Sequence, residues 1–128
     1  LQQDVWSTLN YPDPLHVFNP LHLAPWEKPT QINDHFTLLK LEKSLLTIAL
    51  PSQQFDVIYF DAFAPNKQPE MWEYPVLAKV VATLKPGGVF VTYCAKGQLK
   101  RDLKALGLLV ESLPGPPGKR EMVRARKP

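Results

Sequence analysis

The chain has 128 residues, of which 45% are hydrophobic and 21% charged, and its net charge at pH 7 is +3. This composition is typical of a soluble globular protein with one modest core. No apolar run approaches the roughly 20 residues that cross a bilayer, which excludes a membrane span, and no signal-peptide pattern is visible. One cysteine, Cys94, cannot form an internal disulfide, so we expect a cytoplasmic protein.

Charge is distributed unevenly along the chain. Residues 1–95 hold 6 Lys/Arg and 9 Asp/Glu, whereas residues 96–128 hold 9 Lys/Arg and 3 Asp/Glu. A basic end on an otherwise acidic chain indicates a polyanionic partner, and the phosphate backbone of a nucleic acid is the obvious candidate. A solvated tail beyond the last strand explains the same charge, so both interpretations stay open.

The first part of the chain shows no sustained hydrophobic period. Residues 1–9 are compatible with the end of a helix, and prolines then recur every few residues as far as residue 29. The segment is too apolar for a disordered tail. We therefore expect residues 1–35 to form an irregular, proline-rich segment packed on the domain, and the chain to begin in the middle of a domain.

A strand is predicted at residues 36–42, followed by a short helix at 43–50 that Pro51 ends. The continuous apolar run at 57–60 suits a strand covered on both faces. This strand delivers Asp61 to its carboxyl end, and ligands of open α/β sheets bind outside the carboxyl ends of strands. Asp61 is therefore the first candidate site residue. Glu42 has two interpretations. It is either a second site carboxylate at the same sheet edge as Asp61, or an exposed acid at a strand end without a function, and the local sequence slightly favours the second.

Residues 70–84 show the apolar spacing of a helix. Pro86-Gly87-Gly88 is a stop signal, and residues 89–95 follow as a buried strand. Together with the strand that ends before Asp61, these elements form a βαβ unit with parallel strands.

The remaining sequence predicts one more helix and a hairpin. Residues 98–106 form a basic amphipathic helix with Gly107 at its C′ position. Strands at 108–113 and 121–126 are joined by a short proline- and glycine-rich turn, which favours an antiparallel hairpin.

The predicted fold class is α/β. Parallel strands closed by an antiparallel hairpin resemble the C-terminal part of a class I, Rossmann-like methyltransferase fold. The first half of that fold carries a glycine-rich cofactor loop after a strand, whereas Gly87-Gly88 precedes one. We therefore expect a single, N-terminally truncated methyltransferase domain over residues 1–128, with its α/β core at 36–128.

Three motifs narrow this class further. They are Phe-Asp-Ala-Phe-Ala-Pro at 60–65 with Met-Trp at 71–72, Lys-Pro-Gly-Gly at 85–88, and Pro-Pro-Gly-Lys-Arg-Glu-Met at 116–122. In this order they resemble the methyltransferase domain of the bacterial MnmC tRNA-modification family, over residues 36–126. Gln68 stands where that family usually has asparagine.

The resemblance implies an S-adenosyl-L-methionine-dependent methyltransferase that acts on tRNA. Its substrate would be the 5-aminomethyl-2-thiouridine at the wobble position, and its product the 5-methylaminomethyl nucleoside. The resemblance also implies that the first strands and the glycine-rich loop of the family lie outside these 128 residues.

Asp61 would orient the amine and receive or relay its proton, because a protonated amine has no lone pair for attack. The alternative is that Asp61 caps the following loop through an Asx-type bond. The resemblance also implies that Asp61 and Glu42 bind the cofactor, with Glu42 near its adenine. Phe63 and Trp72 are candidates for stacking on a base, and each suits the core at least as well.

Basic residues are the candidates for tRNA contact. The substrate-binding set is Phe63, Pro65, Lys67, Lys96, Lys119 and Arg120. Lys100 and Arg101 better fit a solvated helix face, and Glu121 is expected to pair with a basic neighbour. Cys94 is expected to be a buried thiol. The three histidines lack metal-ligand spacing, so no metal is predicted.

Two other functions stay open. One is another class I transferase, such as a small-molecule methyltransferase or an aminopropyltransferase. The other is an inactive fragment that binds RNA or self-associates, and an unpaired sheet edge would then favour a homodimer.

Overall fold

The computed structural model describes residues 14–128, so the helix end expected at 1–9 lies outside the described residues. The chain divides into two compact units, Leu1–Lys43 and Ser44–Pro128, which are treated separately below. The expectation of a single domain stays a prediction, because a domain can contain more than one compact unit.

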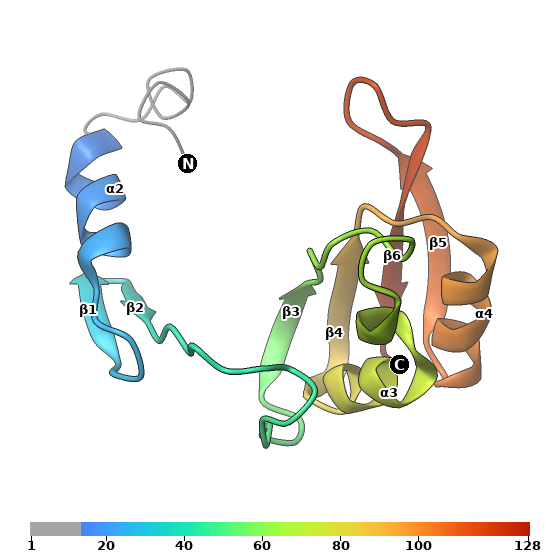
Figure 1. Cartoon of the computed structure of the whole chain (residues 1–128), viewed down its shortest axis with the longest axis horizontal. Helices are drawn as coiled ribbons and strands as arrows, with labels where there is room; N and C mark the ends of the chain where they lie inside the picture. The colour runs from blue at the N-terminus through green and yellow to red at the C-terminus, as the bar shows by residue number, and fades with distance from the viewer. Residues whose placement is uncertain (1–13) are drawn as a thin grey trace. The chain divides into compact units, whose positions relative to one another are not determined.

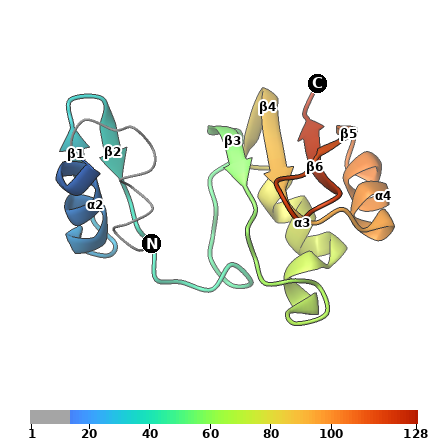
Figure 2. The ribbon, with the colours of Figure 1, turned by 90° about the horizontal axis from the view of Figure 1, so that it is seen from above.

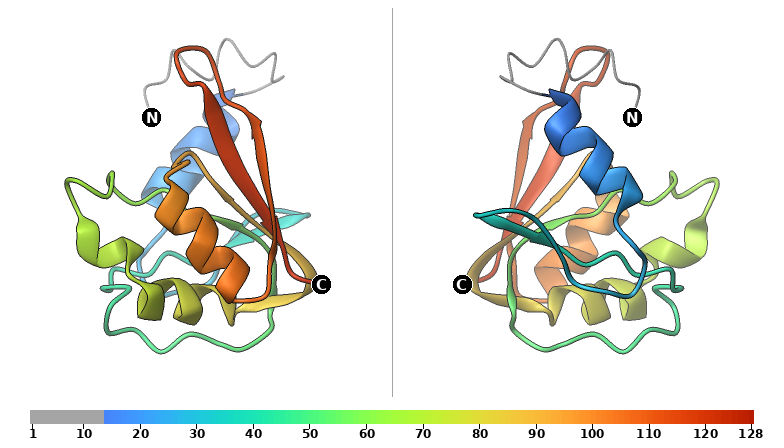
Figure 3. Two further views of the ribbon diagram at one scale, coloured as in Figure 1. Left: turned by 90° about the vertical axis from the view of Figure 1, so that its right-hand side faces the viewer. Right: turned by 90° about the vertical axis from the view of Figure 1, so that its left-hand side faces the viewer.

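The described part of the first unit holds one helix and a two-stranded antiparallel sheet. Helix α2 spans Pro14–Leu23, and strands β1 (Thr30–Asn33) and β2 (Phe36–Leu38) pair with each other (Figure 3). The prediction of an irregular segment up to residue 35 is therefore wrong for the described residues. The strand expected at 36–42 is shorter, and its partner is β1.

Local contacts explain why regular structure forms in this proline-rich stretch. Pro14 opens α2, where a missing N–H costs nothing. At the other end, the Lys40 ammonium donates to the carbonyls of Leu21 at 3.2 Å and His22 at 3.3 Å, which satisfies the last turn of the helix. Lys40 also lies over the Trp26 ring, 5.0 Å from its centroid. These contacts join residues far apart in sequence, so sequence periodicity cannot reveal them.

The helix predicted at 43–50 is not present. Residues 45–47 form a turn, in which the Ile48 N–H donates to the Ser44 carbonyl at 2.9 Å. The Ser44 hydroxyl accepts a competing bond from the Leu46 N–H at 3.2 Å. With Pro51 close behind, the chain makes one turn and does not propagate it.

The second unit is built on a four-stranded sheet in the order β3-β4-β6-β5 (Figure 1). The strands are β3 (Phe55–Tyr59), β4 (Leu84–Thr92), β5 (Leu109–Pro114) and β6 (Glu121–Arg126). Strands β3 and β4 are parallel, β4 and β6 are antiparallel, and β5 and β6 form an antiparallel hairpin. The predicted parallel pair closed by a hairpin is thus confirmed.

Helices cover one face of this sheet (Figure 2). They are the short 3-10 helix η1 (Pro69–Trp72), α3 (Tyr74–Val81) and α4 (Gly97–Ala105). The predicted helix at 70–84 is divided because Glu73 is extended, and α3 ends at Val81. The core side chains that are fully buried between helices and sheet are Leu77, Leu84, Phe90, Leu103 and Val123. No helix among residues 14–128 has the length and apolarity to span a membrane.

The Pro-Gly-Gly sequence lies inside β4 rather than before it. Phe55 pairs with Leu84 and Val57 with Val89, and the register shifts between these pairs. Gly87 has φ +82°, and a Cβ at Gly88 would lie 2.9 Å from the Lys85 carbonyl oxygen. The expected stop signal therefore acts as a bulge, which brings the β4 backbone close to β3.

Gly107 occupies the C′ position of α4, as predicted. Its φ is +89°, its N–H donates to the Lys104 carbonyl at 2.9 Å, and the Leu108 N–H donates to the Leu103 carbonyl at 3.1 Å. This pair of bonds is a Schellman motif, which turns the chain from α4 into β5.

Strand β3 is less buried than its sequence predicts. Phe55, Val57 and Tyr59 are exposed, Tyr59 by 81%, whereas Ile58 is half-buried toward the helices. The prediction of cover on both faces is wrong for the described residues, because side chains alternate along a strand and these three lie on the face opposite the helices (Figure 2).

Candidate functional site

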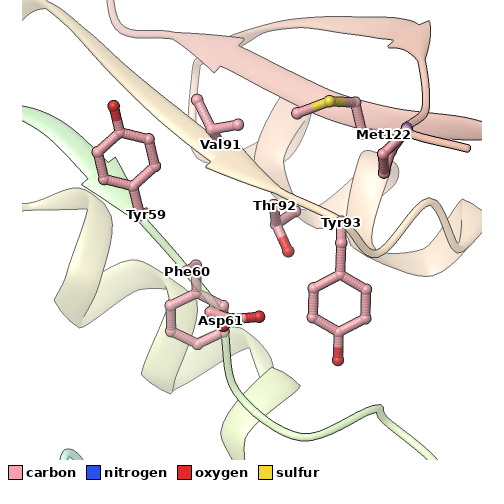
Figure 4. Close-up of a pocket in the computed structure, with 8 residues that line it drawn as sticks. Tyr59, Phe60, Asp61, Val91, Thr92, Tyr93 and Met122 are labelled. Carbon is pink, nitrogen blue, oxygen red and sulfur yellow. The ribbon is translucent and has the colours of Figure 1, made fainter. Parts of the chain in front are cut away.

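A pocket of about 280 Å³ lies where the parallel strands β3 and β4 end (Figure 4). This is the sheet edge at which open α/β folds bind ligands. Its lining comes from both strands, the residues that follow them, and the β5–β6 hairpin: Tyr59, Phe60, Asp61, Val91, Thr92, Tyr93, Pro116 and Met122. The pocket is mainly aromatic and aliphatic, and Asp61 is its one carboxylate.

Asp61 lies two residues after the end of β3, close to its predicted place at the carboxyl end of the strand, and its carboxylate points toward Tyr93 (Figure 4). The side chain is exposed. No hydrogen bond or ion pair to this carboxylate is found in the described part of the chain, so the expected alternative, an Asx-type cap of the loop, is not observed. The carboxylate is therefore available to a ligand.

Two side chains brace the loop that follows Asp61. The Trp72 indole N–H donates to the Phe63 carbonyl at 2.8 Å, and the Tyr93 hydroxyl donates to the Ala62 carbonyl at 2.7 Å. Trp72 is buried and packs edge-on against Phe60, with ring centroids 5.0 Å apart. Of the two aromatic candidates, Trp72 thus belongs to the core, whereas Phe63 is 75% exposed.

Tyr93 also contacts the hairpin turn between β5 and β6. The Lys119 ammonium lies 4.0 Å from the centroid of its ring, within the range of a cation–π interaction. Burial raises the pKa of Tyr93 above its usual value, with smaller contributions from Cys94 and Asp61. At neutral pH the phenol therefore keeps its proton and remains a donor.

Of the eight lining residues, Asp61 alone was predicted from the sequence, and the others include Tyr59, Tyr93 and Met122. Tyr93 directly follows β4, the second parallel strand, so the rule that pointed to Asp61 would also have selected it. Met122 lies in the Lys-Arg-Glu-Met motif, of which only the basic residues were predicted to contact a ligand.

The basic candidates divide into two groups. Lys119 is brought to the pocket through Tyr93, whereas Lys67, Lys96 and Arg120 are exposed and do not line it. Pro65 is half-buried in the turn after Asp61 and also lies outside the lining.

Two expectations for the hairpin and α4 are confirmed, and a third is not, because Lys100 is half-buried rather than solvated. Glu121 pairs with the Lys100 ammonium at 2.9 Å, and this hydrogen bond and charge lower the pKa of Glu121. Arg101 donates to the Gln98 side chain at 3.0 Å on the exposed face of α4. These contacts fix the base of the hairpin against the helix and leave neither Lys100 nor Arg101 free of partners.

Glu42 lies in the first unit, after the end of β2. The expectation that it ends a strand of the same sheet as Asp61 is wrong, because β2 ends at Leu38 and pairs with β1. Its backbone N–H donates to the Glu27 carboxylate at 2.9 Å. A cofactor-binding role for Glu42 stays a prediction.

Metal ligands and thiol chemistry were also considered. In the described residues, no group of three or more His, Cys, Asp or Glu side chains is arranged to hold a metal ion. Cys94 is a buried free thiol, as expected.

Comparison with known proteins gives a consistent result. A family model described as S-adenosyl-L-methionine-dependent methyltransferase matches residues 26–128. A bifunctional tRNA 5-methylaminomethyl-2-thiouridine biosynthesis protein MnmC from Hydrogenovibrio crunogenus is 32% identical over 109 residues, which is 84% of this chain and 16% of that protein. Its counterpart from Actinobacillus pleuropneumoniae is 34% identical over 79 residues, 62% of this chain and 12% of that protein.

The solved structure of MNMC2 from Aquifex aeolicus shares the fold, with a TM-score of 0.69 at 24% identity, over 84% of this chain and 35% of that one. The chain thus spans a minor part of the length of each relative it matches. The expected Rossmann-like methyltransferase fold is confirmed. Because the family model covers most of the sequence, the chain belongs to the S-adenosyl-L-methionine-dependent methyltransferases, in the MnmC-like group that its motifs indicated.

Proposed function

We propose that this protein transfers a methyl group to the 5-aminomethyl-2-thiouridine at the wobble position of tRNA. The observation that carries the proposal is the Asp61 carboxylate, which has no protein partner in the described residues and lines an aromatic pocket at the carboxyl ends of β3 and β4. A flat base with an aminomethyl arm matches this combination, since aromatic side chains stack on bases and a carboxylate binds an amine.

The reaction requires a neutral amine. Asp61 would accept a hydrogen bond from the amine, hold it in line for attack, and receive or relay a proton. The neutral amine nitrogen would then take the methyl group of the donor, and the electron pair of the broken carbon–sulfur bond would leave with the donor's sulfur. The new secondary ammonium loses a proton, for which Asp61 offers an exit toward solvent because its side chain is exposed.

S-adenosyl-L-methionine, when bound, supplies a methyl group activated by a sulfonium. The pocket fits the reacting part of such a group: its lining is mostly apolar and contains Tyr59, Phe60 and Tyr93, whose ring faces attract cations. Asp61 is the pocket residue that would hold a hydroxyl or the cation itself. Glu42 is proposed as a further contact, to the adenine end.

The tRNA would be held by the exposed basic residues around this sheet edge. Lys67 lies in the turn after Asp61, Lys96 precedes α4, and Arg120 belongs to the hairpin turn, which projects beyond the sheet (Figure 1). Pro65 and the exposed Phe63 are proposed to contact the nucleotide. A tRNA substrate would place the reaction in the cytoplasm.

The substrate test uses the full-length protein, labelled methyl donor, and tRNA that carries 5-aminomethyl-2-thiouridine. The control is the same tRNA with 2-thiouridine, which lacks the amine. We expect methyl incorporation into the first tRNA alone, with the product nucleoside identified by mass spectrometry. Methylation of small amines but not of tRNA would contradict the proposal and favour another class I transferase.

Charge reversal tests the tRNA surface separately. Lys67→Glu and Arg120→Glu should each weaken tRNA binding and reduce its salt dependence, because each removes a phosphate contact. Lys104→Glu, an exposed lysine near the end of α4, serves as the matched control. Equal losses in all three variants would show that net charge, not this surface, determines binding.

A further inference from the structure

The side chain of Tyr93, which lines the pocket, contacts residues from three separate segments of the chain. Its hydroxyl donates to the Ala62 carbonyl at 2.7 Å, and its ring carries the Lys119 ammonium at 4.0 Å. The same ring packs edge-on against Trp72, with centroids 6.2 Å apart. The side chain therefore links the end of β4 to the Asp61 loop on one side and to the hairpin turn on the other.

We propose that Tyr93 is a positioning residue, which fixes the Asp61 loop through its hydroxyl and the hairpin turn through its ring. The proposal rests on the proposed function, because it assigns Tyr93 a role in presenting Asp61 to the amine. Tyr93 acts through Ala62, so it need not touch the reacting atoms.

The hydroxyl matters because the loop has few other restraints near Asp61. The Asp61 side chain has no partner in the described residues, so its direction is determined by its backbone. The peptide that follows is fixed at Ala62 by Tyr93, and the next one at Phe63 by Trp72. Loss of the first bond leaves the Ala62 carbonyl unpaired in a half-buried position and frees the residue that carries the carboxylate.

The ring matters because Lys119 extends from a turn whose other hydrogen bonds, among the described residues, lie within the turn or at its base. The Lys119 N–H donates to the Pro116 carbonyl at 2.9 Å, and the Glu121–Lys100 pair lies where β6 begins. Pro116 lines the pocket, so the contact of Lys119 with Tyr93 holds the turn over the pocket that Asp61 enters. Lys119 is exposed, and its contact with tRNA stays a proposal.

The test compares two substitutions that separate the hydroxyl from the ring. Tyr93→Phe removes the bond to Ala62 and keeps the surface on which Lys119 lies, whereas Tyr93→Leu removes both. Tyr74→Phe, an exposed tyrosine at the start of α3, is the matched control. Each variant is measured by amide hydrogen exchange at residues 61–64, by the NMR shift of the Lys119 side chain, and by kcat and KM for tRNA.

Tyr93→Phe should speed exchange at residues 61–64 and lower kcat about tenfold, with KM for tRNA unchanged, since misplacement of a reacting group acts on the chemical step. The ring-current shift of Lys119 should persist in Tyr93→Phe and disappear in Tyr93→Leu. Exchange rates in Tyr93→Phe equal to those of Tyr74→Phe would overturn the proposal, as would unchanged kcat.

The first two measurements need neither methyl donor nor tRNA. If the wild type does not methylate tRNA, the proposed function fails, whereas unchanged exchange in Tyr93→Phe overturns the positioning role whatever the substrate. Faster exchange would support the role in the absence of turnover.

Discussion

The two edges of the four-stranded sheet differ in kind. On β5, the outer edge carries Glu111, paired with Arg124 of β6 at 2.6 Å, and ends in Pro114. On β3, the exposed side chains include Phe55, Val57 and Tyr59. Charges and prolines discourage further strand pairing, whereas an apolar edge invites it.

The outer side of β5 is thus protected against further strand pairing, whereas β3, at the other edge of the sheet, carries an exposed apolar surface. Nothing in the described residues supports the homodimer expected through this edge.

The largest effect is expected in the core that both edges share. Phe90 is fully buried at the centre of the sheet, so Phe90→Ala should cost about 3–5 kcal/mol and disrupt both edges together. Urea unfolding followed by Trp72 fluorescence measures this loss. Phe63→Ala, at an exposed position, should change the free energy of unfolding by less than about 0.5 kcal/mol, and similar losses in both variants would contradict the assigned core.

A smaller effect, confined to one edge, is expected at the bulge. A Cβ at Gly88 would approach the Lys85 carbonyl oxygen to 2.9 Å and the Asp56 carbonyl oxygen to 3.2 Å. Gly88→Ala should therefore cost about 1–3 kcal/mol and raise amide exchange in β3 more than in β5. The control is Gly97→Ala, where the nearest atoms belong to the flexible Arg101 side chain. Equal exchange in both edge strands would show that the bulge does not specifically hold β3.

The smallest effect on stability is expected from a charge on the apolar edge. Val57→Lys should change the free energy of unfolding by less than about 0.5 kcal/mol, because the side chain is 47% exposed. It should nevertheless slow aggregation, measured by light scattering at matched protein concentration. A parallel substitution on β5, Ser112→Lys, should have little effect, and equal slowing at both edges would remove the distinction between them.

Much of the second unit could be predicted from sequence. The parallel pair, α4 with Gly107, the hairpin and the position of Asp61 depend on local periodicity and turn residues, which act over short distances. The misses depend on distant contacts or on backbone detail. Helix α2 is completed by Lys40, the turn at 45–47 depends on Ser44, and Pro-Gly-Gly forms a bulge because β3 lies alongside.

The site was predictable to a similar degree. Asp61 could be predicted because the sequence shows where a strand ends and ligands bind at the carboxyl ends of parallel strands. The same rule applies to Tyr93, which follows β4. The contact of Lys119 with Tyr93 joins two motifs through space, and no spacing in the sequence indicates it.

The central claim, that Asp61 handles the amine, is tested most directly by single-turnover methyl transfer to tRNA with Asp61→Asn. The control is Asp56→Asn, an exposed aspartate on β3 that pairs with Lys85. We predict that Asp61→Asn slows transfer by about a hundredfold or more, with thermal stability and tRNA affinity unchanged, because the side chain is exposed and acts on the proton of the amine. Transfer at the rate of Asp56→Asn would contradict the claim.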